Sequence, residues 1–248
     1  MTSCLMVGLL VAASAACGGS PEAIRAGTAA SRAPGEIASP ADTTRGLPPL
    51  PVAPSASALP MYSATIAPID AALAERMSAS WRPGCPVPPE DLRYVTFTYL
   101  DFEDQVRTGE VVLHADVAEA IVDVFAALFA ARYPLRQVRL VDDFGADDTT
   151  SMEADNTSAF NCRAITGGTA WSEHAYGRAI DVNPVENPYV VGTHVSPSAG
   201  RDFAARPEAP GVIQVDDVVV RAFAAAGWQW GGYWDSPKDY QHFSVNGR

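Results

Sequence analysis

Two short segments of the sequence each place a histidine near an aspartate, and together these residues could hold a metal ion. WSEHAYGRAIDVNP contains His174 and Asp181, and DYQHF, close to the end of the sequence, contains Asp239 and His242. A catalytic zinc ion takes three protein ligands from His, Asp, Glu or Cys and keeps a fourth position open. His174, Asp181 and His242 could form such a centre, with Asp239 left to move protons as a general base. Spacing alone also allows a second interpretation, in which both histidines are structural.

The first segment has a pattern that would bring its two candidate ligands together. Gly177 lies between them, where a turn would let a loop histidine and a strand carboxylate converge. In RAIDVN, Ile180 and Val182 occupy one face of a predicted strand, so Asp181 points to the other face and into a cleft.

The elements around these segments indicate one α+β domain with a small, mostly antiparallel sheet and flanking helices. Asp116 is placed to cap the strongest helix, which Pro134 ends, and Gly227 is placed to end another. A long polar stretch at 144–170 reads as an irregular, functional loop. Apolar spacing predicts helices within 69–81, 114–134 and 216–228, and alternation predicts strands at 92–102, 109–114 and 136–144, the first two forming a hairpin.

Charge and composition limit the partners. The net charge is -12 and Lys238 is the only lysine, which disfavours nucleic acid and anionic membrane surfaces because both need clustered positive charge. We expect a monomer that meets a membrane only through an N-terminal lipid anchor.

The N-terminus reads as an export signal followed by a tether. Residues 1–17 resemble a signal peptide of the lipoprotein type, in which Cys17 becomes the lipidated residue; a plain cleaved signal peptide is the alternative. Residues 18–60 are rich in Pro, Ala and Ser and predict a disordered linker, so 61–248 forms the folded domain. Cys85 and Cys162 would remain as a pair in an oxidising compartment, which predicts a disulfide.

Two motifs carry a resemblance to a known family. SEHAYGRAID is similar to the S-x-H-x-x-G-x-A-x-D signature of the zinc D-alanyl-D-alanine carboxypeptidases and L-alanyl-D-glutamate endopeptidases, the VanY-like group with the Hedgehog/DD-peptidase fold. GWQWGGYWDSPKDYQHF resembles the closing motif of the same family. The similarity spans roughly 84–243 and points to a secreted bacterial branch.

The resemblance implies a role for each matching residue. His174, Asp181 and His242 match the ligands of one zinc ion per chain, and Asp239 matches the catalytic acid/base, where many members carry Glu. Arg163 matches an arginine that stabilises the oxyanion near the scissile carbonyl, although a structural salt bridge is its alternative.

Other residues have two open interpretations. Ser172 either binds substrate or orients the loop. Trp230 and Trp234 could wall the cleft, whereas Trp228 reads as core. His114 and His194 read as surface or loop residues. Polar residues of the 144–170 stretch could bind peptide but favour turns and caps; they are Asp147, Asp148, Ser151 and Ser158.

The resemblance therefore implies an exported zinc metallopeptidase, lipid-anchored on the outer face of a bacterial cell membrane or otherwise secreted. Its partners would be peptidoglycan stem peptides, with Ser172, Ser158 and Trp234 as expected substrate contacts. The reaction would be either D-alanyl-D-alanine carboxypeptidase or L-alanyl-D-glutamate endopeptidase. The alternative from another class is a non-catalytic zinc-containing domain that binds the cell wall.

Overall fold

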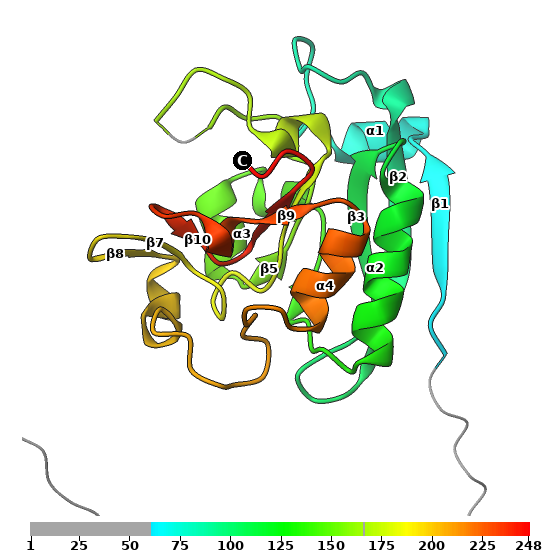
Figure 1. Ribbon diagram of the computed structural model, residues 1–248. Coiled ribbons are helices and arrows are strands. Elements are labelled where there is room, and N and C mark those ends of the chain that lie inside the picture. The colour runs from blue at the N-terminus through cyan, green and yellow to red at the C-terminus, as the bar shows by residue number, and fades with distance from the viewer. Residues whose placement is uncertain (1–60, 166) are drawn as a thin grey trace, which may run out of the picture. The chain divides into compact units, whose positions relative to one another are not determined.

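Figure 1 shows a computed structural model of the chain, which describes residues 61–165 and 167–248. The predicted signal peptide, Cys17 and the predicted linker up to residue 60 lie outside the described residues. Within the described part of the chain, no helix is long and apolar enough to cross a membrane.

The first half of the domain is an antiparallel sheet covered by a helix. The strands β1 (Ala64–Pro68), β2 (Leu92–Leu100) and β3 (Val106–His114) lie in that order, and the predicted hairpin pairs Leu100 with Val106. The helix α2 (Ala118–Ala130) lies against this sheet, where Phe125 stacks on Phe97 with ring centroids 3.9 Å apart.

A second helix joins this layer to the C-terminal strands. The helix α4 (Val218–Ala225) begins at Asp217, whose carboxylate accepts a hydrogen bond from the Val220 N–H, and Gly227 follows its end with φ 82°. It lies beside α2 in Figure 1. Phe223 of α4 stacks on Phe243 of β11 (His242–Ser244) at 4.0 Å, and both are fully buried. One apolar core therefore supports both the first sheet and the strand that carries His242.

The strands of the C-terminal half form several small sheets and not a single large sheet. Two three-stranded antiparallel sheets have the orders β6-β11-β9 and β10-β7-β8, and β4 pairs with β5 in parallel. These elements confirm an α+β fold. The strands are β4 (Gln137–Val138), β5 (Asn156–Thr157), β6 (Ala179–Asp181), β7 (Tyr189–Val191), β8 (His194–Ser196), β9 (Gln229–Trp230) and β10 (Lys238–Asp239).

Short helices complete the domain. They are α1 (Ala71–Arg76), α3 (Asp148–Glu153) and the 3-10 turns η1 (Pro89–Asp91), η2 (Val141–Phe144), η3 (Glu173–Tyr176), η4 (Ser198–Phe203) and η5 (Gly231–Tyr233).

Three local predictions were wrong. The strand expected at 136–144 ends at Val138, because the next N–H, that of Arg139, donates to the Asn156 side chain at 2.9 Å instead of to another strand. The stretch at 144–170 is not wholly irregular, since it contains α3 and β5. Asp116 does not cap α2; its carboxylate instead pairs with His114 and Arg178, each at 2.6 Å.

The predicted disulfide is present. Cys85 and Cys162 are bonded, and Cys162 lies in a small second core with Met77, Leu92 and Phe160. The bond therefore ties the segment that continues into Arg163 to the loop after α1.

Candidate metal centre

His174 is held by a tight turn whose two ends are specified by sequence. It lies in η3, where the Ser172 hydroxyl accepts a 3.4 Å hydrogen bond from its N–H, and Gly177 ends the turn with φ 66°. A Cβ on Gly177 would lie 2.6 Å from the backbone nitrogen of His114. Only glycine fits both this conformation and this close approach to β3.

The other two candidate ligands face each other across a strand pair. Asp181 ends β6 and His242 begins β11, and they are direct partners in the antiparallel register. Ile180 and Val182 are fully buried in the core, as the alternation predicted, so Asp181 lies on the opposite face.

The three side chains converge on one point. Ligand atoms of His174, Asp181 and His242 all lie within 4.8 Å of one another, and all three side chains are buried. His174 Nε2 is 3.3 Å from His242 Nδ1, and the Asp181 carboxylate oxygens lie 3.2 Å and 3.0 Å from these two nitrogens.

Hydrogen bonds on the far side of each ring decide which nitrogens can bind a cation. His174 Nδ1 is 2.6 Å from the Ala159 carbonyl oxygen, and His242 Nε2 is 3.0 Å from that of Arg248. A carbonyl oxygen only accepts, so these two nitrogens carry the protons. In neutral rings, His174 Nε2 and His242 Nδ1 then direct lone pairs toward each other and toward a carboxylate. Three buried acceptors cannot satisfy one another, so the cluster requires a positive charge between them.

The spacing fits a small tetrahedral metal ion. Two Zn–N bonds of about 2.0–2.1 Å at a tetrahedral angle place the nitrogens about 3.4 Å apart, and the observed separation is 3.3 Å. The carbonyl partners of both rings are the outer contacts that usually orient metal-binding histidines. Two histidines and one carboxylate also leave a coordination position for a substrate or water.

The electrostatics of the cluster also favour bound positive charge. Burial raises the pKa of Asp181, but its charge and hydrogen-bond interactions with both histidines outweigh burial and hold that pKa far below its usual range. Burial lowers the pKa of His242, yet the hydrogen bond and charge of Asp181 raise it to about 9. A metal ion would take the place of that proton, and its binding would release it.

Asp239 lies beside this cluster without belonging to it. It is half-buried in β10, next to the strand that carries His242. Burial and the negative charge of Asp181 raise the pKa of Asp239 to about 6, while the two histidines oppose the shift. Its carboxyl group can thus exist in both protonation states near neutral pH, as an acid/base group requires.

Gly231, which the sequence did not single out, packs against the segment that carries Asp239 and His242. A Cβ on Gly231 would lie 2.6 Å from the carbonyl oxygen of Asp239, 3.0 Å from its Cβ and 3.4 Å from the Cβ of His242. Because Gly231 has no side chain, the backbone of the turn η5 packs directly against both residues. The Gly-Gly pair in the closing motif was the available signal.

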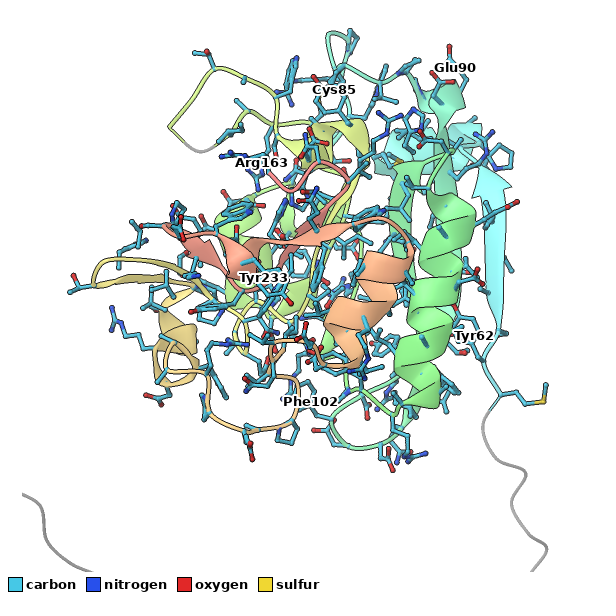
Figure 2. The ribbon with its side chains drawn as sticks, in the orientation of Figure 1. Tyr62, Cys85, Glu90, Phe102, Arg163 and Tyr233 are labelled. Atoms are coloured by element: carbon cyan, nitrogen blue, oxygen red, sulfur yellow. A yellow bond between two sulfur atoms is a disulfide. The ribbon has the colours of Figure 1, made fainter. Side chains whose placement is uncertain are left out.

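Arg163 lies on the segment beside His174 but is already paired. Its guanidinium lies 2.8 Å from a carboxylate oxygen of Asp148 in α3, and both side chains are about one quarter exposed. The segment is anchored because Ser172 N–H donates to the Arg163 carbonyl at 3.1 Å. Figure 2 shows Arg163 on the same side of the domain as Cys85.

Of the other residues singled out in the sequence, some hold the elements that carry the candidate ligands and others lie close to His242 or in the core. Ser172 caps η3, which favours its loop-orienting role over substrate binding. Ser158 is buried and exchanges two backbone hydrogen bonds with Asp181, of 2.9 Å and 3.0 Å. Trp234 is half-buried, and its ring centroid lies 5.8 Å from that of His242. Trp228 and Trp230 are both 3% exposed and belong to the apolar core, as predicted for Trp228.

The polar stretch before the site is mainly structural. Asp147 caps α3 by accepting from the Thr150 N–H at 2.7 Å, and Ser151 is buried against Asn156 at 3.1 Å. His114 ends β3 half-buried, and His194 is exposed in β8.

Comparison with known proteins agrees with this site. Residues 166–245 match a protein-family model described as D-alanyl-D-alanine carboxypeptidase. No curated protein and no solved structure matches the chain. The matched segment includes His174, Asp181, Asp239 and His242, whereas Arg163 and Ser158 precede it. The resemblance seen in the sequence is thus confirmed for the segment that carries the site, which is similar to the D-alanyl-D-alanine carboxypeptidase family of peptidases.

Proposed function

We propose that the protein is a zinc metallopeptidase that hydrolyses a peptide bond in the stem peptide of bacterial peptidoglycan. The observation that carries this proposal is the convergence of two imidazole lone pairs and one carboxylate inside a segment that matches a peptidase family. His174, Asp181 and His242 would hold the ion. Bound zinc would supply a Lewis acid for the carbonyl and lower the pKa of the attacking water.

Other side chains of the protein would transfer the proton, stabilise the oxyanion and contact the substrate. Asp239 accepts a proton from the attacking water at its carboxylate and passes it to the leaving amine nitrogen. Arg163 directs a guanidinium toward the oxygen that becomes negative in the tetrahedral state. Asp148 restrains Arg163 through their ion pair. Ser158 and Trp234 lie beside Asp181 and His242 and would contact the substrate.

Two bonds remain as candidates. A D-alanyl-D-alanine carboxypeptidase would release one alanine from the stem, whereas an L-alanyl-D-glutamate endopeptidase would release the rest of the stem peptide. The family match favours the first by its description. Either reaction acts on peptidoglycan, so the enzyme must lie outside the cytoplasm. The disulfide between Cys85 and Cys162 supports export. We further propose that Cys17 anchors the chain to the outer face of the membrane and that the domain acts as a monomer.

The proposal is tested with the full chain, isolated with its metal content intact. Mass spectrometry of digested muropeptides should show loss of one alanine or of the stem remainder. His174→Ala should lose both zinc and hydrolysis, while His194→Ala, an exposed histidine in β8, should keep both. Hydrolysis by metal-free protein would contradict the proposal. Zinc-loaded protein without turnover, but with saturable binding to sacculi, would instead support a non-catalytic cell-wall-binding domain.

A further inference from the structure

A hollow on the surface begins at the back of the candidate metal centre. It lies between the end of α4, the turn η5 and the last residues of the chain, and we call it the tyrosine hollow. Among the residues that line it are Gln229, Tyr233, Trp234, Asp235, Asn246 and Arg248. None of these is a candidate metal ligand, and only Trp234 has a part in the proposed hydrolysis, which therefore leaves most of the hollow unexplained.

Tyr233 presents a fixed aromatic surface in this hollow. Its side chain is 51% exposed, in contrast to the buried Trp228 and Trp230 nearby. Its hydroxyl donates to a carboxylate oxygen of Asp216 at 3.0 Å, and its ring meets the Trp230 ring edge-on with centroids 5.2 Å apart. The ring is therefore held in place, so a ligand that stacks on it loses little side-chain entropy in ordering it. Figure 2 shows Tyr233 beside α4 and the C-terminal strands.

Apolar residues, among them Val220, Ala224 and Pro237, line part of the hollow, and the polar groups that line the rest carry little net charge. Gln229 and Asn246 are exposed and offer amide donors and acceptors, and the charges of Asp235 and Arg248 oppose each other. A pyranose ring has an apolar C–H face and a rim of hydroxyl and acetamido groups. An exposed aromatic ring that shares its hollow with two amide side chains matches both parts of such a ligand. A highly charged ligand would find no matching cluster of opposite charge among these residues.

Two residues of the hollow also contact His242 of the candidate metal centre. The Trp234 ring lies 5.8 Å from the His242 ring, and its indole N–H donates to the Gly247 carbonyl at 2.8 Å. The Arg248 carbonyl accepts from His242 Nε2 at 3.0 Å. A stem peptide bound at the centre is attached at its N-terminal end to the glycan strand, so an intact substrate continues into a sugar beyond its peptide.

We propose that the tyrosine hollow binds the glycan strand of peptidoglycan, with Tyr233 stacking on an N-acetylated sugar ring. This inference rests on the proposed function for its choice of ligand. It makes the preferred substrate a stem peptide still attached to its glycan, and it assigns recognition of the sugar to residues outside the metal centre.

Direct binding tests this inference without requiring hydrolysis. The probe is soluble peptidoglycan glycan chains from which an amidase has removed the stem peptides, titrated into the full chain by calorimetry. Wild type should bind, and Tyr233→Ala should weaken binding about tenfold, as expected for loss of a stacked ring. Tyr233→Phe, which keeps the ring, should retain most of the affinity. Val106→Ala in β3, also at an exposed apolar residue, should bind as wild type does.

The outcomes separate this inference from the proposed peptidase activity. No binding of peptide-free glycan, or equal binding by wild type and Tyr233→Ala with unchanged circular dichroism, would overturn the glycan site even if stem peptides are cleaved. Weakened binding of free stem peptide alone would assign the hollow to peptide, and loss of self-association in Tyr233→Ala would assign it to a second copy; each result would overturn the inference. Glycan binding that depends on Tyr233 in a protein without hydrolysis would support the site while contradicting the peptidase.

Discussion

Replacing Gly231 with alanine should disturb the metal centre from outside it. The new Cβ would lie 2.6 Å from the Asp239 carbonyl oxygen, whereas ordinary contacts begin at 3.4 Å, so the two backbones must separate by about 0.8 Å (3.4 - 2.6). Both neighbours are backbone or Cβ atoms, which cannot swing aside as the end of a long side chain can. Overpacking of this kind costs about 1–3 kcal/mol. Because the displaced segment leads into His242, zinc affinity should fall about tenfold or more, as it does when the groups that orient metal ligands are altered.

Two measurements and one control test this reasoning. Urea denaturation gives the free energy of unfolding, and competition with a chromophoric chelator gives the zinc affinity. Gly168→Ala is the matched control, because its Cβ would meet nothing closer than 3.5 Å and should change neither quantity. If Gly231→Ala has the unfolding free energy and the zinc affinity of wild type, close packing of η5 does not position His242, and our account of the Gly-Gly pair is wrong.

Two further predictions concern pairs of ionisable side chains. Asp148→Asn removes the charge that restrains Arg163, so kcat on muropeptides should fall several-fold with unchanged zinc content; a rise in kcat would show that Asp148 competes with the substrate instead. Burial, together with the neighbouring Asp155, raises the pKa of Glu186 from 4.5 to about 8. The folded protein then holds a proton that the unfolded chain releases, so the unfolding free energy should fall as pH rises between these values. Glu186→Gln should remove this dependence. The unfolding free energy of the variant, relative to that of wild type, should therefore be about 1–3 kcal/mol higher at pH 8 than at pH 5. Parallel pH profiles of the unfolding free energy, measured by denaturation, would contradict the assignment.

The sequence predicted the elements whose signals are local. The helix α4 was recognisable because apolar spacing and Gly227 agree, and the β2-β3 hairpin followed from alternation. The turn at Gly177 was predicted for the same reason, since a residue with positive φ favours glycine.

Features that depend on distant contacts were not predictable from local patterns. The strand after Arg136 ends early because the Asn156 side chain takes its next hydrogen bond, and Asp116 pairs with Arg178 instead of capping α2. The packing of Trp230 in the core near Phe243 also depends on tertiary contacts. The pairing of Arg163 with Asp148 likewise depends on the tertiary packing that brings α3 to Arg163.

The candidate ligands were recognisable by motif, but their arrangement required the fold. Residue types and spacing indicated His174, Asp181 and His242 without showing which nitrogens face the ion. Backbone carbonyls of Ala159 and Arg248 determine that choice, and both contacts depend on tertiary packing.

Zinc titration of the chelated protein tests the central claim most directly. Zinc is added stepwise to metal-free full chain while muropeptide hydrolysis is followed by mass spectrometry. If His174, Asp181 and His242 hold the catalytic ion, activity should rise with bound zinc and level off at about one ion per chain. Full hydrolysis before zinc is added, or zinc binding at that stoichiometry without any hydrolysis, would contradict the account.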